Sequence, residues 1–200
     1  MFILDEVMTS RLAPGGIQGL VGLQPDMKTF GKYLGGGLAF GAFGGRESIM
    51  SVYDPRVQDS LAHSGTFNNN TLAMHAGYAG LAHVYTPEAA TAFSAKGDAF
   101  RQRLQDVTED TKISFTGCGT LMAMHISQTG VRDIKCKEDV EEILEVKDLF
   151  WMEMLEEGFW TTRRGMIALI LDTPQEELDR FVDCVKAFVD RHRRLVVLEN

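Results

Sequence analysis

The stretch PDMKTFGKYLGGGLAFGAFGG (Pro25–Gly45) decides the fold of this chain, because it alternates short apolar runs with glycine. Met27–Gly31 and Phe40–Gly44 are typical of two short strands, and Lys32 opens the glycine-rich loop between them. Of the 20 glycines in the chain, 11 fall between Gly15 and Gly45. Such a concentration indicates a backbone that turns sharply or approaches another group closely.

Upstream of this stretch, the chain opens with the apolar run Met1–Leu4, which ends in Asp5 and Glu6. A bare apolar run followed by acids is typical of a buried strand of a parallel sheet, with polar residues at its carboxyl end. Such a strand needs neighbours on both sides, so we expect the chain to be the C-terminal part of something longer. Asp5 lies 27 residues before Lys32. Strand-end carboxylates and loop lysines are where open α/β sheets build ligand sites.

Glycine-rich loops often hold nucleotides, but the known nucleotide patterns fail here. The residue five positions before Gly31 is Asp26, and Tyr33 follows the lysine, so the Walker A pattern is not met. Phe40 breaks the G-x-G-x-x-G dinucleotide pattern. The nucleophile elbow G-x-S-x-G is absent from the sequence.

The pair Asp5 and Lys32 fits a different chemistry. A lysine amine forms a Schiff base with an aldehyde cofactor, and a carboxylate keeps a pyridine nitrogen protonated so that the ring becomes an electron sink. The same residues also fit a plainer interpretation, with Asp5 as a strand-end acid that caps a helix or turn and Lys32 as a solvated loop lysine. Spacing alone leaves both interpretations open.

The composition is that of an ordinary globular protein, with 44% hydrophobic residues, 20 Lys and Arg, 28 Asp and Glu, and a formal charge of −8. An acidic balance without a basic block argues against nucleic acid as a partner. No apolar run reaches the roughly 18 residues that cross a bilayer, and the acidic N-terminus is unlike a signal peptide. Three widely spaced cysteines suit reduced thiols, and the histidines form no zinc pattern. We therefore expect a cytoplasmic protein without a membrane, nucleic-acid or metal partner.

Downstream, the sequence predicts a helix over Asn70–Tyr85 and a second helix that starts at Thr86-Pro87. We divide the chain near residue 110, with residues 1–109 as the end of an α/β sheet domain and residues 110–200 as a small α+β domain. The second part is predicted to contain strands at Ile113–Phe115, Leu121–His125, Phe159-Trp160 and Met166–Leu171, a helix over Glu138–Glu157, and a final helix opened by a capping box at Thr173–Glu176.

Three blocks of sequence resemble successive motifs of the class III aminotransferases, and most closely the glutamate-1-semialdehyde 2,1-aminomutase branch. They are LDEVMTSR (Leu4–Arg11), PDMKTFGKYLGGGLAFGAFGG (Pro25–Gly45) and HSGTFNNNTLAMHAG (His63–Gly77). The resemblance covers essentially the whole chain, but only about the second half of a typical family member. It implies a fold-type I transferase that depends on pyridoxal 5′-phosphate (PLP), with the C-terminal part of the large sheet domain followed by a small α+β domain.

The resemblance also implies roles for three residues of the first part. Lys32 matches the lysine that holds the cofactor as a Schiff base and then moves a proton between carbon atoms as general base and acid. Asp5 matches the carboxylate paired with the pyridinium nitrogen. Val7 matches the residue that packs on one face of the cofactor ring.

Two further matches concern the phosphate and the substrate. Thr66, with the backbone of Gly65 and Phe67, matches the loop that reaches the cofactor phosphate of the other subunit, which implies a homodimer. Arg164 precedes a predicted strand and suits a substrate carboxylate, although a surface or interface ion pair is an equally good interpretation.

The chain departs from the family pattern in three places. Ala39-Phe40 stands where the family has proline after GGGL, and Asn68–Asn70 replaces a Gly-Asn-Pro-like run, so the substrate of the namesake enzymes should not be copied. The N-terminal half, which supplies most of the phosphate cup in the family, is missing. We therefore expect a fragment that binds the cofactor poorly by itself.

Three functions follow from the resemblance. The first is a PLP-dependent enzyme that moves an amino group within one amino aldehyde, as an aminomutase does, with activity impaired by the truncation. The second is an ω-aminotransferase that moves the group between an amine and a keto acid. The third is a non-catalytic fragment that keeps the dimerisation surface.

Overall fold

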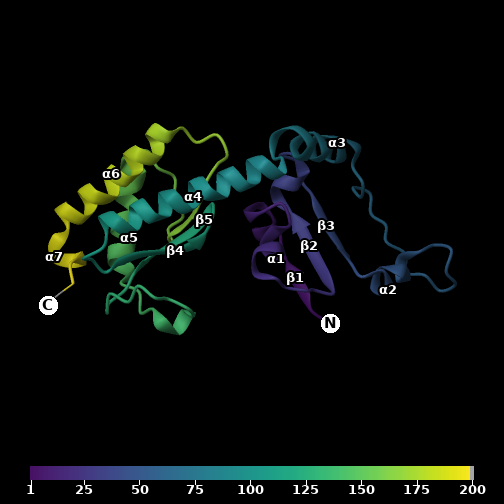
Figure 1. The fold of residues 1–200 in the computed structure, drawn as a ribbon, viewed down its shortest axis with the longest axis horizontal. Coiled ribbons are helices and arrows are strands. Elements are labelled where there is room, and N and C mark those ends of the chain that lie inside the picture. Colours follow the sequence, from purple (N-terminus) through teal and green to yellow (C-terminus); the bar gives the residue numbers. More distant parts are fainter. Residues whose placement is uncertain (199–200) are drawn as a thin grey trace. The chain divides into compact units, whose positions relative to one another are not determined.

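The computed structural model describes residues 1–198 and contains two compact units, Met1–Ala92 and Phe93–Asn200 (Figure 1). The boundary falls inside helix α4 (Pro87–Val107). The predicted division near residue 110 lies after the C-terminal end of this helix and stays a prediction about the domains of the whole enzyme. Each unit has its own three-stranded sheet.

The sheet of the first unit has the order β1-β2-β3, formed by Ile3–Asp5, Met27–Gly31 and Gly41–Gly45. β1 and β2 are parallel, and Asp5 lies opposite Thr29. β3 runs antiparallel to β2. The strand predicted at Met27–Gly31 is confirmed to the residue, and the third strand begins one residue later than predicted. The parallel pairing brings the carboxyl ends of β1 and β2 to the same edge of the sheet, which places Asp5 near the start of the loop at Lys32.

The first strand is not buried as predicted, since Ile3 is 51% exposed. The physical reason is that β1 is an edge strand, paired on its inner side with β2 and with no other strand of residues 1–198. Its amino end is fixed by Asp26, whose Oδ2 accepts a hydrogen bond of 2.6 Å from the Phe2 N–H. Arg46, just after β3, makes an ion pair of 2.9 Å with the other oxygen of Asp26.

The helix predicted over Asn70–Tyr85 is present as α3 (Thr71–Ala79) followed by a π-helical turn. Asn70 caps its start, because the side-chain Oδ1 accepts the Ala73 N–H at 3.1 Å. The remaining helical segments of this unit are short: η1 (Thr9–Leu12), α1 (Gly16–Val21), η2 (Lys32–Gly35), α2 (Glu47–Met50), η3 (Ser51–Tyr53) and the π turn η4 (Gly80–Val84).

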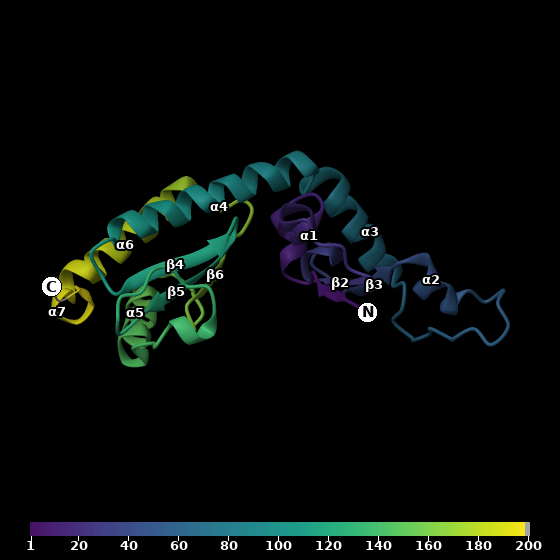
Figure 2. The same ribbon diagram turned by 60° about the horizontal axis from the view of Figure 1, so that its bottom comes forward.

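The second unit has an antiparallel sheet of β4 (Ile113–Cys118), β5 (Leu121–Ile126) and β6 (Met166–Ala168). Helices α4 and α6 run side by side along this sheet (Figures 1 and 2). The other helices are η5 (Lys137–Asp139), α5 (Leu144–Glu156), α6 (Gln175–Arg191) and α7 (Arg193–Val196).

The core of the second unit is built around one face of α6. The aromatic rings of Phe150 on α5 and Phe188 on α6 pack edge to face with centroids 5.1 Å apart. Those of Phe100 on α4 and Phe181 on α6 lie 5.9 Å apart. The apolar face predicted for this helix is confirmed, because all its members are buried: Leu178, Phe181, Val182, Val185, Phe188 and Val189.

Three local predictions in this unit are wrong. The helix predicted from Glu138 begins at Leu144, because Glu142 is held in an extended bridge to Ser127 and its carboxylate accepts the Ile126 N–H. The capping box at Thr173 does not form, since its hydroxyl donates to the Ile170 carbonyl. Phe159-Trp160 is a loop rather than a strand. Within residues 1–198, the helices are all too short or too polar to cross a membrane.

Candidate functional site

Asp5 is the last residue of β1, and hydrogen bonds reach one of its two carboxylate oxygens. Its Oδ1 accepts hydrogen bonds from the Val7 N–H at 2.9 Å and from the Thr29 hydroxyl at 3.0 Å. The Oδ2 atom accepts none from the residues that the structure describes. The Val7 N–H, the Thr29 hydroxyl and the Lys32 charge lower the pKa of Asp5 against a smaller opposing effect of desolvation. Asp5 is therefore an ionised carboxylate with one oxygen available to a ligand.

Lys32 follows β2 directly and begins η2. Its φ is 57°, in the left-handed region that residues with a side chain rarely adopt. The amine is exposed to solvent and lies close enough to Asp5 for its charge to act on that carboxylate. The structure thus brings together the two residues that the sequence singled out.

Val7 lies just beyond β1 and faces the last residue of β2. A Cβ atom placed on Gly31 would lie 3.5 Å from Val7 Cγ1 and 3.3 Å from the Phe40 carbonyl oxygen. The backbone at Gly31 is therefore closely flanked by these two neighbours. Val7 thus lies against the residue that precedes Lys32.

Glu6 is a residue of this site that sequence reasoning missed. It is fully buried, although it follows Asp5 in an acidic pair. Its carboxylate accepts hydrogen bonds from the Thr9 hydroxyl at 2.6 Å, the Ile17 N–H at 3.1 Å and the Gln18 N–H at 3.0 Å. It therefore ties the segment after β1 to the start of α1.

Gly16 shows how tightly this connection is built. Its φ is +70°, and a Cβ atom there would lie 2.5 Å from Glu6 Oε1. The signal in the sequence was a glutamate at a strand end followed ten residues later by the pair Gly15-Gly16, where N–H groups without a helical partner need an acceptor.

The segment with Gly65, Thr66 and Phe67 is an exposed loop between η3 and α3, and Phe67 is 84% exposed. Figure 1 shows that the chain between α2 and α3 runs out from the sheet and returns to it, and Phe67 lines a cavity together with Phe40, Gly41 and Ala42. Its base is fixed by His63, whose ring packs edge to face on Phe43 at 5.3 Å and Tyr53 at 5.7 Å between centroids. The loop is thus exposed to solvent and lies beside the end of the glycine-rich loop.

The two departures from the family pattern line one cavity. Its volume is about 520 Å³. Ala39 and Phe40 contribute from the end of the glycine-rich loop, and Asn68–Asn70 contribute from the other side. Ala73 and Met74 of α3 complete the wall. Residues that are 30 positions apart in the sequence therefore line the same space.

Arg164 belongs to the second unit and sits in a turn before β6. Its guanidinium is exposed and donates to Met166 Sδ at 3.4 Å. The neighbouring Arg163 makes a bidentate pair with Asp148, with Nε to Oδ1 at 2.7 Å and Nη2 to Oδ2 at 2.5 Å. Within residues 1–198, Arg164 makes no ion pair, and no set of His, Cys, Asp and Glu side chains could hold a metal ion.

Comparison with known proteins places this geometry in a family. Residues 1–187 match the family model for class III aminotransferases. The chain is 52% identical to an uncharacterised aminotransferase of Schizosaccharomyces pombe, which covers 98% of this chain and 44% of that protein. It is 31% identical to a glutamate-1-semialdehyde 2,1-aminomutase of Akkermansia muciniphila, over 96% of this chain and 45% of that protein.

A solved structure supports the same assignment. The crystal structure of a β-phenylalanine aminotransferase from Variovorax paradoxus superposes with a TM-score of 0.92 at 42% identity, over 99% of this chain and 46% of that chain. The chain thus spans about half the length of these relatives, which fits the predicted correspondence to one half of a family member. The fold is that of the fold-type I transferases, as predicted, and the chain belongs to the class III aminotransferases, a family of PLP-dependent enzymes.

Proposed function

We propose that this chain carries the lysine and carboxylate part of a PLP site for amino-group transfer between an amine and a keto acid. The observation that carries the proposal is the ionised Asp5, with one free oxygen, at the same sheet edge as Lys32. A protonated pyridine nitrogen needs such an anion, and Oδ2 is the atom available to accept its N–H. The residues present therefore fit the cofactor that the family uses.

Each residue has a defined task in this proposal. Bound PLP supplies the electron sink that makes a proton on the substrate removable. Asp5 holds the proton on the ring nitrogen, and the Val7 side chain beside Gly31 supports one face of the ring. The Lys32 amine would hold the cofactor through its aldehyde and would serve as the base and acid that moves a proton between carbon atoms of the substrate.

The phosphate and the subunit arrangement form a further part of the proposal. The exposed loop Gly65–Phe67 offers backbone N–H groups and the Thr66 hydroxyl, which suit a phosphate. Because this loop is exposed to solvent, we propose that it serves the site of a second copy of the chain. A homodimer is then required for each complete site.

For the substrate, we propose a β-amino acid whose carboxylate is bound by Arg164. The exposed guanidinium has no ion-pair partner among residues 1–198, so it is available for bidentate binding of a carboxylate. The 42% identity to the β-phenylalanine transaminase exceeds the 31% identity to the aminomutase, and this favours the intermolecular reaction. The residues that depart from the family pattern line the cavity of about 520 Å³, so the substrate of the aminomutases is not copied to this chain.

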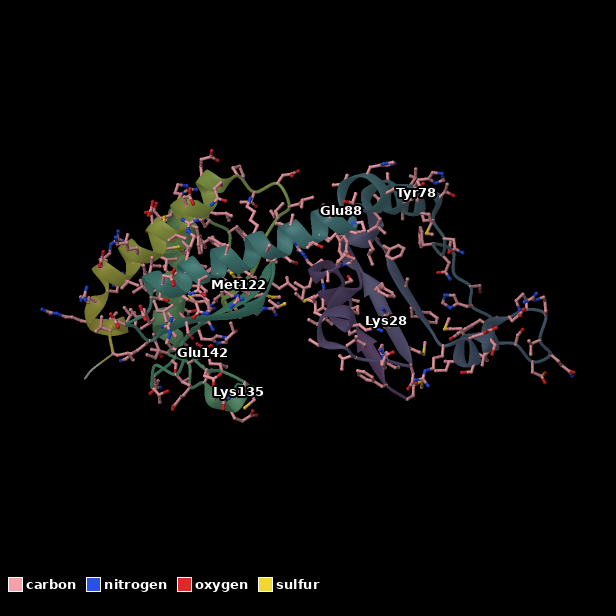
Figure 3. The ribbon with its side chains drawn as sticks, viewed as in Figure 1. Lys28, Tyr78, Glu88, Met122, Lys135 and Glu142 are labelled. Atoms are coloured by element: carbon pink, nitrogen blue, oxygen red, sulfur yellow. The ribbon has the colours of Figure 1, made fainter. Side chains whose placement is uncertain are left out.

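Trapping the cofactor on the chain tests the lysine assignment directly. The purified chain is mixed with PLP, reduced with borohydride and mapped by peptide mass spectrometry. We expect the adduct at Lys32 in preference to Lys28, which lies in β2 and serves as a matched control (Figure 3). Asp5→Asn should lower the yield at Lys32. Adducts spread evenly over the lysines would contradict the proposal and favour a non-catalytic fragment.

An intramolecular aminomutase reaction is the second candidate, supported by the motif resemblance and by the A. muciniphila relative. The protein is incubated with glutamate-1-semialdehyde and no keto acid. Only an aminomutase should still form 5-aminolevulinate. Transfer from β-phenylalanine to a keto acid, without 5-aminolevulinate in the first assay, is the result expected here.

A further inference from the structure

Two consecutive residues of α5, Lys147 and Asp148, contact the residues on either side of Arg164. The turn runs from Thr162 to Met166, and it is closed by hydrogen bonds from the Gly165 N–H to the Thr162 carbonyl at 2.8 Å and from the Met166 N–H to the Thr162 hydroxyl at 2.8 Å. Because the turn is closed on itself, its contacts with the rest of the unit fix the position of Arg164.

Asp148 holds the residue before Arg164. Its two carboxylate oxygens take the Nε and Nη2 atoms of Arg163 in a bidentate pair, which fixes the plane of that guanidinium. The pairing with Arg163 lowers the pKa of Asp148. Of two adjacent arginines with the same charge, one is therefore tied to the protein while the other is exposed and without an ion pair among residues 1–198.

Lys147 holds the residue after Arg164. It is only 6% exposed, and a Cβ atom on Gly165 would lie 2.8 Å from its Cε and 2.5 Å from the Met124 carbonyl oxygen. The Gly165 backbone therefore lies directly on the lysine stem, with a φ of +88° and a hydrogen bond of 2.8 Å from the Met124 N–H to its carbonyl. A side chain at Gly165 would push the turn away from Lys147 and Met124.

The buried lysine is itself fixed by a polar chain that ends in the sheet. Its Nζ donates to Glu142 Oε1 at 2.7 Å, and the same oxygen lies 3.0 Å from His125 Nδ1 (Glu142 is labelled in Figure 3). His125 Nε2 in turn lies 3.0 Å from the Thr116 hydroxyl. A buried ammonium requires such a partner, and this series of hydrogen bonds fixes the lysine that Gly165 packs against.

We propose that Lys147 and Asp148 are positioning residues that hold the turn of Arg164 and keep its guanidinium available for a carboxylate of the substrate. The inference rests on the proposed role of Arg164. It assigns Arg163, despite its identical side chain, to the support of the turn rather than to the substrate. The pair of neighbouring α5 residues thus decides which of the two arginines is available to bind.

The test uses the full chain and two measurements. The first is the backbone ¹⁵N order parameter of residues 162–166, which should be about 0.85 in the unmodified chain and fall toward about 0.6 in Asp148→Asn and Lys147→Met. The second is labelling by phenylglyoxal, read by mass spectrometry, which should favour Arg164 over Arg163. Asp148→Asn should remove that preference, and Asp148→Glu should restore it.

Binding is measured as protection of Arg164 from phenylglyoxal by β-phenylalanine. We expect the concentration for half protection to rise about tenfold in Asp148→Asn and to recover in Asp148→Glu. Glu153→Gln, which removes a different ion-pair acceptor of α5, should leave order, labelling and protection unchanged. If Lys147→Met does not fold, Asp148→Asn alone carries the test.

The outcomes separate the two proposals. An unchanged order of the turn in Asp148→Asn, or equal labelling of the two arginines in the unmodified chain, overturns the positioning inference. Protection that is absent in the unmodified chain, with the order parameters behaving as expected, overturns the role of Arg164 in the proposed function. If β-phenylalanine protects Arg163 from phenylglyoxal in the Arg164→Gln variant, the assignment of substrate binding to Arg164 rather than Arg163 is overturned.

Discussion

The two units differ most in how many of their apolar side chains are buried. Among the residues described, the second unit holds 19 of the 22 buried hydrophobic side chains, and the first unit holds only Leu12, Ala73 and Ala90. The exposed large hydrophobic side chains are distributed the other way, with 16 in the first unit and 5 in the second. Since burial of apolar surface drives folding, the second unit has the means to be stable by itself. The first unit, which carries Asp5 and Lys32, has few such contacts of its own.

The largest expected effect tests the core of the second unit. Phe188→Ala removes a ring that is 1% exposed and packs on Phe150, so it should cost about 3–5 kcal/mol of unfolding free energy. Both tryptophans, Trp151 and Trp160, belong to this unit, so their fluorescence during urea unfolding reports it selectively. Phe43→Ala, in the first unit, removes a ring that is 36% exposed and should leave that transition in place. Equal shifts from both variants would break the comparison.

The next effect concerns the one strongly buried charge of the first unit among the described residues. Glu6→Ala leaves the Ile17 and Gln18 N–H groups without their acceptor and should destabilise the local structure by about 1–3 kcal/mol. Amide hydrogen exchange at these two residues measures it. Glu47→Ala, at an exposed carboxylate, is the control. Unchanged exchange at residues 17 and 18 would show that this carboxylate does not hold the segment.

A pH dependence is expected from Glu142 in the second unit. Burial opposes its ionisation, but the Lys147 ammonium, the Ile126 N–H and His125 outweigh it, so its pKa lies below the ordinary 4.5. A lowered pKa in the folded state stabilises the fold above the unfolded value, and this contribution is lost as the pH falls through the folded value. Urea unfolding between about pH 5 and pH 3 should show this loss, and Glu142→Gln should flatten it. The neighbouring Glu141→Gln should retain the slope; a slope that persists in Glu142→Gln instead would assign the acid sensitivity elsewhere.

The smallest effect is expected at an exposed ion pair of the first unit. Arg56 and Asp54 make a bidentate pair, yet the Arg56 side chain is 88% exposed. Ion pairs that are exposed to water contribute little because the dielectric constant there is high. Arg56→Ala should therefore change the free energy of unfolding by less than about 0.5 kcal/mol. Amide exchange over residues 41–53 provides the measurement. A larger change would mean that the first unit depends on surface charge more than its contacts indicate.

Much of the site could be predicted because its signals are local. Met27–Gly31 alternates and ends in glycine, and the structure has the strand there. The apolar run before Asp5 predicted a strand of a parallel sheet, and the structure has β1 parallel to β2, although at the edge of the sheet. Family membership rested on three short motifs and is confirmed over residues 1–187.

The missed features depend on partners far away in the sequence. Glu6 looks like a solvated acid until Ile17 and Gln18 supply their N–H groups. The helix expected from Glu138 starts late because Glu142 is drawn to Ile126, 16 residues earlier. Periodicity describes one element at a time and carries no information about such acceptors. For the same reason the sequence offered Arg164 as a substrate residue but could not show that Arg163 beside it is already paired.

The left-handed backbone at Lys32 has a consequence for the evolution of the chain. Glycine adopts a φ of 57° freely, whereas lysine pays about 1 kcal/mol for it. Lys32→Gly should therefore be more stable than Lys32→Ala, and at least as stable as the unmodified chain, while losing the amine. A population selected only for folding would drift to glycine at this position. A lysine at this position therefore lowers stability in exchange for an amine that glycine could not supply.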